Sequence, residues 1–504
     1  MTPMSTDTRI RLSIMMFLQY AFNGIWFIPL VTYLTKAGYT GPEVGSMYGT
    51  FALGTIFAPF FVGMLVDRFF SGEKVLGVLN LLSAVTLYLA STMAVDADGG
   101  KQYDLFYWIL LLHFLCYMPT WALTNSIALY QMDNPGKQFP GVRVMGTLGW
   151  IAVGTISLFS SSITSALGVE GNIEATRLPM LLGSAIGLVT GILSFFMPKT
   201  PPKQSATQTT FSDILGVKAL VLFKDRNFLV FAASSLLIMF PALFYWQSCN
   251  LFLNEATALV TSIPAEERAG LNEGVPSQSL KETLEQNGIT FSSDPNVVVL
   301  VADKEWELTN ATGRLLIKDD DGTLNAYGGM SYVMFKMTIG QMAEVIFLVL
   351  MPWFFKRFGV KLMLLIGMLA WTARFFCFGF GNPGNMVPLL YLGLALHGVC
   401  YDFFFVTGQL YVDKKAPKEI QAQAQGLISL ITFGLGWFVG SHLAGMVVGH
   451  YAITQMVEGT EQIVDHVWKS VWLWPIAMVI VITLFFAVLF KDDTVVGREE
   501  PKDA

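Results

Sequence analysis

Long apolar runs separated by short polar connections form the dominant pattern of this chain. A helix needs ~20 predominantly apolar residues to cross the hydrocarbon core of a bilayer, and about twelve runs have that length. Their approximate extents are 10–34, 44–66, 75–94, 105–130, 142–162, 178–197, 228–253, 330–355, 362–380, 389–410, 424–448 and 471–490. Each run predicts a membrane-spanning helix, so the expected fold class is an all-α polytopic membrane protein.

Two polar stretches organise these runs. A linker, 199–226, follows the sixth run and divides the chain into an N-terminal six-helix half, 1–198, and a C-terminal six-helix half, 227–490. A tail, 491–504, ends the chain. The loops after the second and eighth runs both place a basic residue after an apolar segment and a Lys at the start of the next run. Equivalent loops in two such halves indicate the major facilitator architecture.

The second polar stretch, 254–328, lies between the seventh and eighth runs and is too long for an ordinary connection. It contains a helix-like segment, 277–288, and two short apolar runs, 297–302 and 314–318. We expect a small α+β insertion on the outer face. The acidic segment 319–322 lacks the spaced ligands of an EF-hand loop, which favours a solvated turn over a calcium site.

Composition and charge narrow the class further. The chain is 53% hydrophobic and 13% charged, against about 25% charged in average soluble domains. Most of the 31 Lys and Arg residues fall on one side of the predicted spans, which places both termini in the cytoplasm. The first run lacks a small-residue cleavage site and is expected to stay as an anchor. No basic tract for nucleic acid is present, and the four cysteines lie in apolar runs without metal-binding spacing.

Two carboxylates lie inside predicted spans. Glu344 is in the eighth run and Asp402 is in the tenth. An ionisable group at bilayer depth costs at least about 2.5 kcal/mol, and a helix retains one where it faces the bundle interior or a wet cavity. The two acids therefore predict a polar path through the membrane. The alternative is an interhelical pairing that only fixes packing.

Other polar side chains share helix faces with these acids. In the fifth run, Arg143, Thr147 and Trp150 have i, i+4, i+7 spacing, although Arg143 could also extend toward the nearby membrane surface. Gln341 precedes Glu344 by three residues, so the two lie on one face. In the tenth run, His397 and Tyr401 lie one turn apart.

His397 is open to an alternative reading as a packing residue. Arg374, near the outer end of the ninth run, is expected to be an interfacial anchor.

These groups suit a neutral polar solute. Carboxylates and amides bind hydroxyl groups, and aromatic rings stack on planar bases. A carboxylate in a cavity can also exchange a proton between the two sides of a membrane. The residues alone thus predict a proton-coupled carrier and leave nucleosides and sugars both open.

Several motifs together resemble the nucleoside:proton symporter family of the major facilitator superfamily. They are FLQY with Trp26 in the first run, YMPT with Asn125 in the fourth, and FPGVRVMGTLGW in the fifth. Further matches are GQMAE and RFGVK around the eighth run, WTARF in the ninth, and YDFFFVTGQLYVDK in the tenth.

The resemblance implies alternating access by two rocking halves. It also implies functional roles at Arg143, Thr147, Gln341, Glu344 and Asp402, with Trp150, Tyr401 and His397 as neighbours. Candidate positions in the remaining runs are Gln19, Trp26, Asn125, Gln247 and Asn250.

The prediction is proton-coupled nucleoside uptake by a monomer in a bacterial inner membrane, with no cofactor and no metal. Its partners are the nucleoside, protons and the lipid bilayer, without nucleic acid. No P-loop, zinc motif or nucleophile elbow indicates an enzyme. Two alternatives are a proton-coupled sugar or oligosaccharide symporter, and a transporter-like receptor that senses through the outer insertion.

Overall fold

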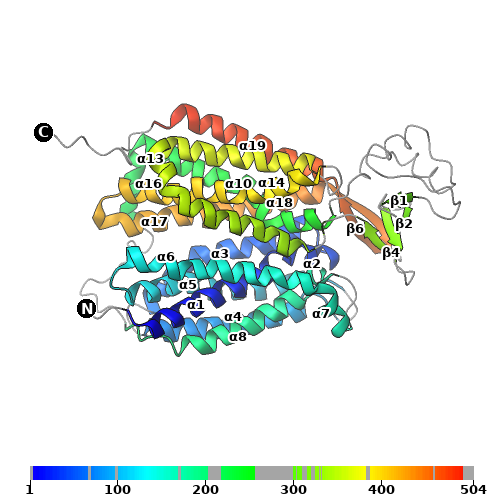
Figure 1. Cartoon of the computed structure of the whole chain (residues 1–504), viewed down its shortest axis with the longest axis horizontal. Coiled ribbons are helices and arrows are strands. Elements are labelled where there is room, and N and C mark those ends of the chain that lie inside the picture. The colour runs from blue at the N-terminus through cyan, green and yellow to red at the C-terminus, as the bar shows by residue number, and fades with distance from the viewer. Residues whose placement is uncertain are drawn as a thin grey trace.

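The computed structural model consists of two bundles of long helices, with the β-strands at the end opposite the two termini (Figure 1). We call these ends the sheet end and the terminal end. The structure describes residues 4–491 except for 66–69, 97–99, 169–171, 202–216, 256–298, 302–303, 309–314, 319–323, 328–329, 331, 382–385 and 458–459.

The N-terminal bundle contains the first six predicted spans. Among its helices, α4 packs on α5 and α8, α1 packs on α6 and α8, and α3 packs on α5. Its elements are α1 (Thr6–Phe27), α2 (Leu30–Lys36), α3 (Gly41–Leu65), α4 (Gly72–Met93), α5 (Tyr103–Tyr130), α6 (Pro135–Gly154), η1 (Thr155–Phe159), α7 (Ser160–Ala166), η2 (Ile173–Ala175) and α8 (Leu178–Ser194).

The C-terminal bundle contains the other six. Its elements are η3 (Val217–Lys224), α10 (Arg226–Glu255), α13 (Val333–Phe380), α14 (Val387–Ala395), α15 (His397–Tyr401), η5 (Asp402–Val406), α16 (Thr407–Lys415), η6 (Lys418–Ile420), α17 (Gln421–Ser429), η7 (Leu430–Gly436), α18 (Trp437–His450) and α19 (Trp468–Leu489). The elements η5 and η7 are π-helical turns that interrupt two of the spans.

Helix α13 contains both the eighth and the ninth predicted span. It turns at Gly359, whose φ of +69° lies in the left-handed region that favours glycine. In the described part of the chain, nine helices are long and apolar enough to cross a membrane. With α13 taken as two spans, and with α3 and the shorter α8, they make up the twelve predicted spans.

The insertion 254–328 contains, in its described residues, a four-stranded antiparallel meander in the order β1-β2-β3-β4, namely β1 (Val299–Val301), β2 (Lys304–Leu308), β3 (Leu315–Lys318) and β4 (Leu324–Tyr327). The two predicted apolar runs of the insertion supply β1 and β3, whereas the predicted helix, 277–288, lies outside the described residues. A second sheet was not predicted. It is the hairpin of β5 (Ala452–Val457) and β6 (Thr460–His466), which connects α18 to α19 at the same end.

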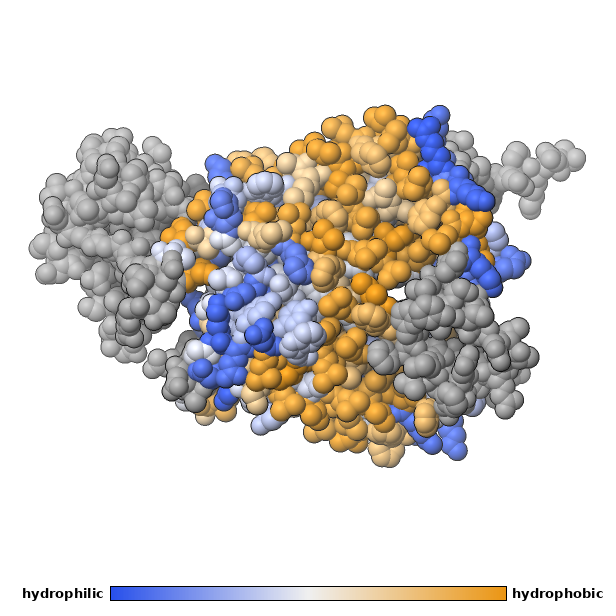
Figure 2. Space-filling model, turned by 180° about the vertical axis from the view of Figure 1, so that it is seen from behind, coloured by the Kyte–Doolittle hydropathy of each residue, from blue (hydrophilic) through white to orange (hydrophobic). Residues whose placement is uncertain are grey.

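The outer surface of the bundles is suited to lipid. Large apolar side chains point outward along the helices, as Val349, Val481 and Val488 do with 73%, 66% and 76% exposure. On the face that Figure 2 shows, a broad apolar region covers much of the helices, with hydrophilic residues toward the two ends. Such an apolar surface is expected where lipid tails, rather than water, contact the protein.

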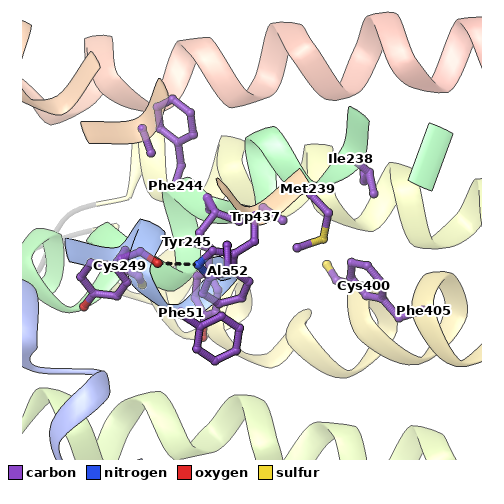
Figure 3. Packing of buried hydrophobic residues seen from close by; sticks show 14 of the residues in the cluster. Phe51, Ala52, Ile238, Met239, Phe244, Tyr245, Cys249, Cys400, Phe405 and Trp437 are labelled. Carbon is purple, nitrogen blue, oxygen red and sulfur yellow. Dashed lines mark hydrogen bonds between the residues drawn. The ribbon is translucent and has the colours of Figure 1, made fainter. Parts of the chain in front are cut away.

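The two bundles are in direct backbone contact near the sheet end, where α3 crosses α18. A side chain at Gly45 would come within 2.6 Å of the Ser441 carbonyl oxygen, so only glycine permits this approach. Farther along the same contact, Phe51 of α3 stacks on Trp437 of α18 with ring centroids 4.3 Å apart (Figure 3). The Trp437 indole Nε1 donates a hydrogen bond of 3.0 Å to the carbonyl of Tyr48.

Candidate substrate and proton site between the bundles

Helix α6 places a cation at the interface between the bundles. It begins after Asn134, whose side chain caps the helix by accepting a hydrogen bond from the Lys137 amide. Arg143 lies two turns farther on, and its guanidinium Cζ lies 4.3 Å from the centroid of the Tyr20 ring of α1. Such a position over an aromatic face stabilises a cation that is only partly hydrated. The guanidinium of Arg143 therefore contacts the Tyr20 ring within the protein.

Helix α13 brings an acid to this cation from the other bundle. The charges of Arg143 and Glu344 are close enough to act on each other and on the hydroxyl groups of Tyr20 and Tyr401. Both charged side chains are described, and they form no ion pair within 4.0 Å. Their interaction thus crosses the interface without a direct contact that would lock the two bundles together.

Asp402 begins the π-helical turn η5. Its side chain is 1% exposed, and within the described part of the chain neither carboxylate oxygen has a hydrogen-bond partner. A buried acceptor left unpaired is costly, and π-turns occur often at functional sites. Glu344 lies close enough for the two acids to repel each other. Asp402 is therefore the side chain in this region with the greatest capacity to accept hydrogen bonds from a ligand.

His397 lies one turn before Asp402 and is 4% exposed. Its ring lies 5.9 Å from the Tyr401 ring, and its Nδ1 lies 2.9 Å from Nη1 of Arg374. The prediction that Arg374 is an interfacial anchor is wrong, because this side chain is 0% exposed. The helix α15 packs against α13 so tightly that only a glycine fits at position 398 beside the backbone of Glu344.

Two predicted polar residues of α10 are in different environments. Gln247 is 1% exposed and its Oε1 has no partner among the described residues. Asn250, by contrast, is fully engaged: its Oδ1 accepts a 2.6 Å hydrogen bond from Thr32, and its Nδ2 donates a 2.7 Å hydrogen bond to Glu174. The amide oxygen of Gln247 is thus unpaired within the described part of the chain, whereas Asn250 connects the two bundles.

Three further predicted residues belong to the N-terminal bundle. The Gln19 amide donates to Thr120 at 2.7 Å and accepts from Asn80 at 3.1 Å, so it is part of an internal network. Trp26 packs edge-on against the rings of Phe27 and His113. The amide oxygen of Asn125 has no partner within the described part of the chain, as is also true of Gln341 Oε1 on α13 and Trp150 Nε1 on α6.

Thr147, which shares the α6 face of Arg143, is partly exposed. Among the predicted site residues, the groups without a partner in the described part of the chain are mostly acceptors, together with the indole donor of Trp150. They are Asn125, Trp150, Gln247, Gln341 and Asp402.

A buried carboxylate at the sheet end was not predicted. Glu174 lies in η2, between α7 and α8, and is 0% exposed. It accepts three hydrogen bonds from the other bundle: from the Asn250 side chain at 2.7 Å, the Asn254 side chain at 3.2 Å and the Met334 amide at 3.0 Å. Burial raises the pKa of Glu174 above its ordinary value, although the three N–H donors oppose that shift.

Two six-helix bundles with charged groups at their shared interface define a secondary transporter of major facilitator architecture. The profile of the Nucleoside H+ symporter family matches residues 4–266 and 296–495 of the chain. The chain belongs to this family, which is a family of transporters and not of enzymes.

Individual relatives agree with this membership. The Putative nucleoside transporter YegT of Escherichia coli (strain K12) is 33% identical over 96% of this chain and 94% of its own length. The Xanthosine permease of the same organism is 27% identical over 95% of this chain and 94% of its own. The crystal structure of nucleoside transporter NupG has a TM-score of 0.69 at 23% identity and covers 96% of this chain and 100% of that one, which supports the fold.

Proposed function

We propose that this protein takes up nucleosides together with protons, by alternating access, across a bacterial inner membrane. The observation that carries the proposal is Asp402, a buried carboxylate without a hydrogen-bond partner among the described residues, in a family of nucleoside:proton symporters. Two relatives that cover nearly the whole chain are named as nucleoside or xanthosine carriers. The protein works as a monomer, with the sheet end outside and both termini in the cytoplasm, as the distribution of Lys and Arg supports.

In this mechanism, Asp402 accepts hydrogen bonds from the ribose hydroxyls. A carboxylate offers two oxygens and several lone pairs, which match two neighbouring hydroxyl groups. The amide of Gln247 comes from another helix, α10, and supplies further donors and acceptors. The side chains of Tyr401 and Trp150 supply flat apolar surface for the base.

Glu344 is the proposed proton carrier. It lies on one bundle and interacts with Arg143 on the other, so the strength of their interaction depends on how the bundles are arranged. When the bundles move closer at this level, the cation favours release of the proton from Glu344; when they separate, the acid regains its proton. The proton and the nucleoside are then coupled because both sites share one interface.

The contacts at the sheet end correspond to the closed side of the carrier. Glu174, the glycine contact of α3 with α18 and the Thr32–Asn250 hydrogen bond join the bundles there. Alternating access requires these contacts to break when the site opens to the sheet end. Nucleoside release from the state described here is therefore toward the terminal end.

Uptake of radiolabelled uridine and adenosine into transport-deficient bacteria tests the proposal. We expect accumulation that a protonophore abolishes, and we expect free ribose to compete poorly because it lacks a base. A matched variant, Glu43→Gln, changes an acid of the sheet end that pairs with Lys101 inside one bundle, and should transport normally. Absence of uptake for every nucleoside would reject the proposal, and strong competition by free sugars would favour a sugar symporter.

A further inference from the structure

Arg374 is a buried cation that the mechanism above does not use. It lies on the second helix of α13, and its Cζ lies 3.2 Å from the centroid of the Tyr245 ring and 5.3 Å from that of Trp371. No carboxylate in the described part of the chain pairs with it within 4.0 Å, and its Nε and Nη2 have no partner there. A buried guanidinium without an acid is expensive to keep in a membrane protein, which indicates a functional role.

The contact between Arg374 and His397 determines which nitrogen of the imidazole carries the proton. A guanidinium has only N–H donors and cannot accept a hydrogen bond. At a distance of 2.9 Å from Nη1, the Nδ1 atom of His397 must therefore be the acceptor. The imidazole is then neutral with its proton on Nε2, and this tautomer persists as long as the contact does.

His397 is placed where a fixed donor would meet a ligand. A side chain at Gly340 would lie 3.0 Å from Cβ of His397, so the ring sits directly against the α13 segment that carries Gln341 and Glu344. On its other sides it faces Tyr401 at 5.9 Å and Tyr245 at 5.4 Å. In the described part of the chain, Gln341 on this α13 segment and Asp402 have acceptor oxygens without a partner, so an Nε2–H donor on His397 adds a complementary capability.

We propose that Arg374 is a positioning residue that holds His397 as an Nε2–H donor toward an acceptor atom on the nucleoside base. The ribose hydroxyls, which donate, go to Asp402; the carbonyl oxygen or ring nitrogen of the base goes to His397. Arg374 and His397 together thereby select nucleosides whose base carries a hydrogen-bond acceptor opposite Nε2 of His397. This inference rests on the proposed function. It adds that His397 recognises the base, whereas Asp402 recognises the ribose.

Analogues that lack one base acceptor provide the functional test. Uptake of adenosine is compared with that of its 1-, 3- and 7-deaza analogues, each of which lacks one ring-nitrogen acceptor. For at least one pair we expect the wild-type protein to show a KM about tenfold or more higher for the analogue, since a buried donor left unpaired is costly. In Arg374→Gln this ratio should fall below about threefold, because the Gln amide can accept as well as donate and the His397 proton is no longer fixed.

Two variants separate positioning from a general structural role. Arg374→Lys keeps only donors toward Nδ1 and should retain most of the discrimination, whereas Arg357→Gln changes an exposed arginine of α13 near Trp353 and should leave it unchanged. A wild-type KM ratio in Arg374→Gln would overturn the proposal. Equal loss of uptake in Arg374→Gln and Arg374→Lys, with no change in any KM ratio, would also overturn it.

The tautomer itself is measurable without transport. Nitrogen-15 NMR of the imidazole groups, with the His397 signals assigned by their loss in His397→Gln, should show a neutral ring protonated at Nε2 in the wild-type protein. A ring protonated at Nδ1, or at both nitrogens, would contradict the inference. If wild-type protein transports no nucleoside while this spectrum is as expected, the proposed function fails and the positioning of His397 stands.

Discussion

Replacement of Glu174 by Ala is expected to weaken the closure of the sheet end. The change removes the acceptor of three hydrogen bonds that all come from the other bundle. Their donors stay largely buried in the closed state, with Asn250 only 2% exposed. In the open state the same donors meet water, so the loss is specific to closure.

The size of the effect follows from the number of bonds. Each contributes about 1 kcal/mol net, because burial of the carboxyl group offsets part of the gain. Three bonds therefore amount to about 3 kcal/mol, which changes the ratio of closed to open carrier on the order of a hundredfold. A carrier that is mostly closed would become substantially open at the sheet end.

Spin labels on the two bundles report this equilibrium. Lys36 of α2 and Lys469 of α19 are exposed and lie on opposite bundles. Each is replaced by a cysteine that carries a spin label, and double electron–electron resonance measures the distance between the two labels. We expect Glu174→Ala to populate longer distances than the wild-type protein. The matched control is Glu43→Ala, which removes an acid that pairs only within the N-terminal bundle, at 2.8 Å from Lys101. Identical distance distributions for Glu174→Ala and wild type would refute the role of Glu174 in closure.

Three other predictions address coupling, pH and the insertion. Asp402→Asn should lose nucleoside affinity, and Glu344→Gln should lose accumulation while retaining exchange; proton-driven accumulation at the wild-type level in both variants would return the two acids to a packing role. Because the pKa of Glu174 is raised in the closed state, that state binds the proton more tightly. Lowering the pH through the raised pKa should thus increase the closed fraction, and the spin-label distances should lose this pH dependence in Glu174→Gln. Replacement of 256–327 by a Gly/Ser linker should leave a folded carrier by size-exclusion chromatography, since loop length costs little free energy; failure to insert would show that the insertion is integral.

Much of the fold follows from patterns that are local in the sequence. Apolar runs predict the spans, and polar residues between runs predict the connections, because lipid tolerates little else. The turn between the eighth and ninth spans was predicted from the same pattern, and Gly359 provides the backbone conformation for it. The hairpin β5–β6 was missed because it is short and follows a span directly, where its alternating pattern is hard to separate from the end of a helix.

The site could be predicted in part. Asp402 and Glu344 are recognisable because an acid in an apolar run is costly wherever it lies. The π-helical turn at Asp402 leaves no such signal. Burial of Arg374 depends on Tyr245 and His397, which come from other helices, so its position near a span end suggested the surface instead.

Glu174 was missed for a related reason. A single acid in a polar loop is common, and its importance comes from its hydrogen bonds with Asn250, Asn254 and Met334 of the opposite bundle.

The central claim, coupling of nucleosides to protons at the interface of the two bundles, is tested most directly by proton flux. Purified protein in liposomes with an internal pH dye, and with no gradient imposed, is given uridine or adenosine outside. The account predicts that nucleoside addition acidifies the interior in the wild-type protein and not in Glu344→Gln. Nucleoside entry without acidification in the wild-type protein, or full acidification in both Glu344→Gln and Asp402→Asn, would contradict it.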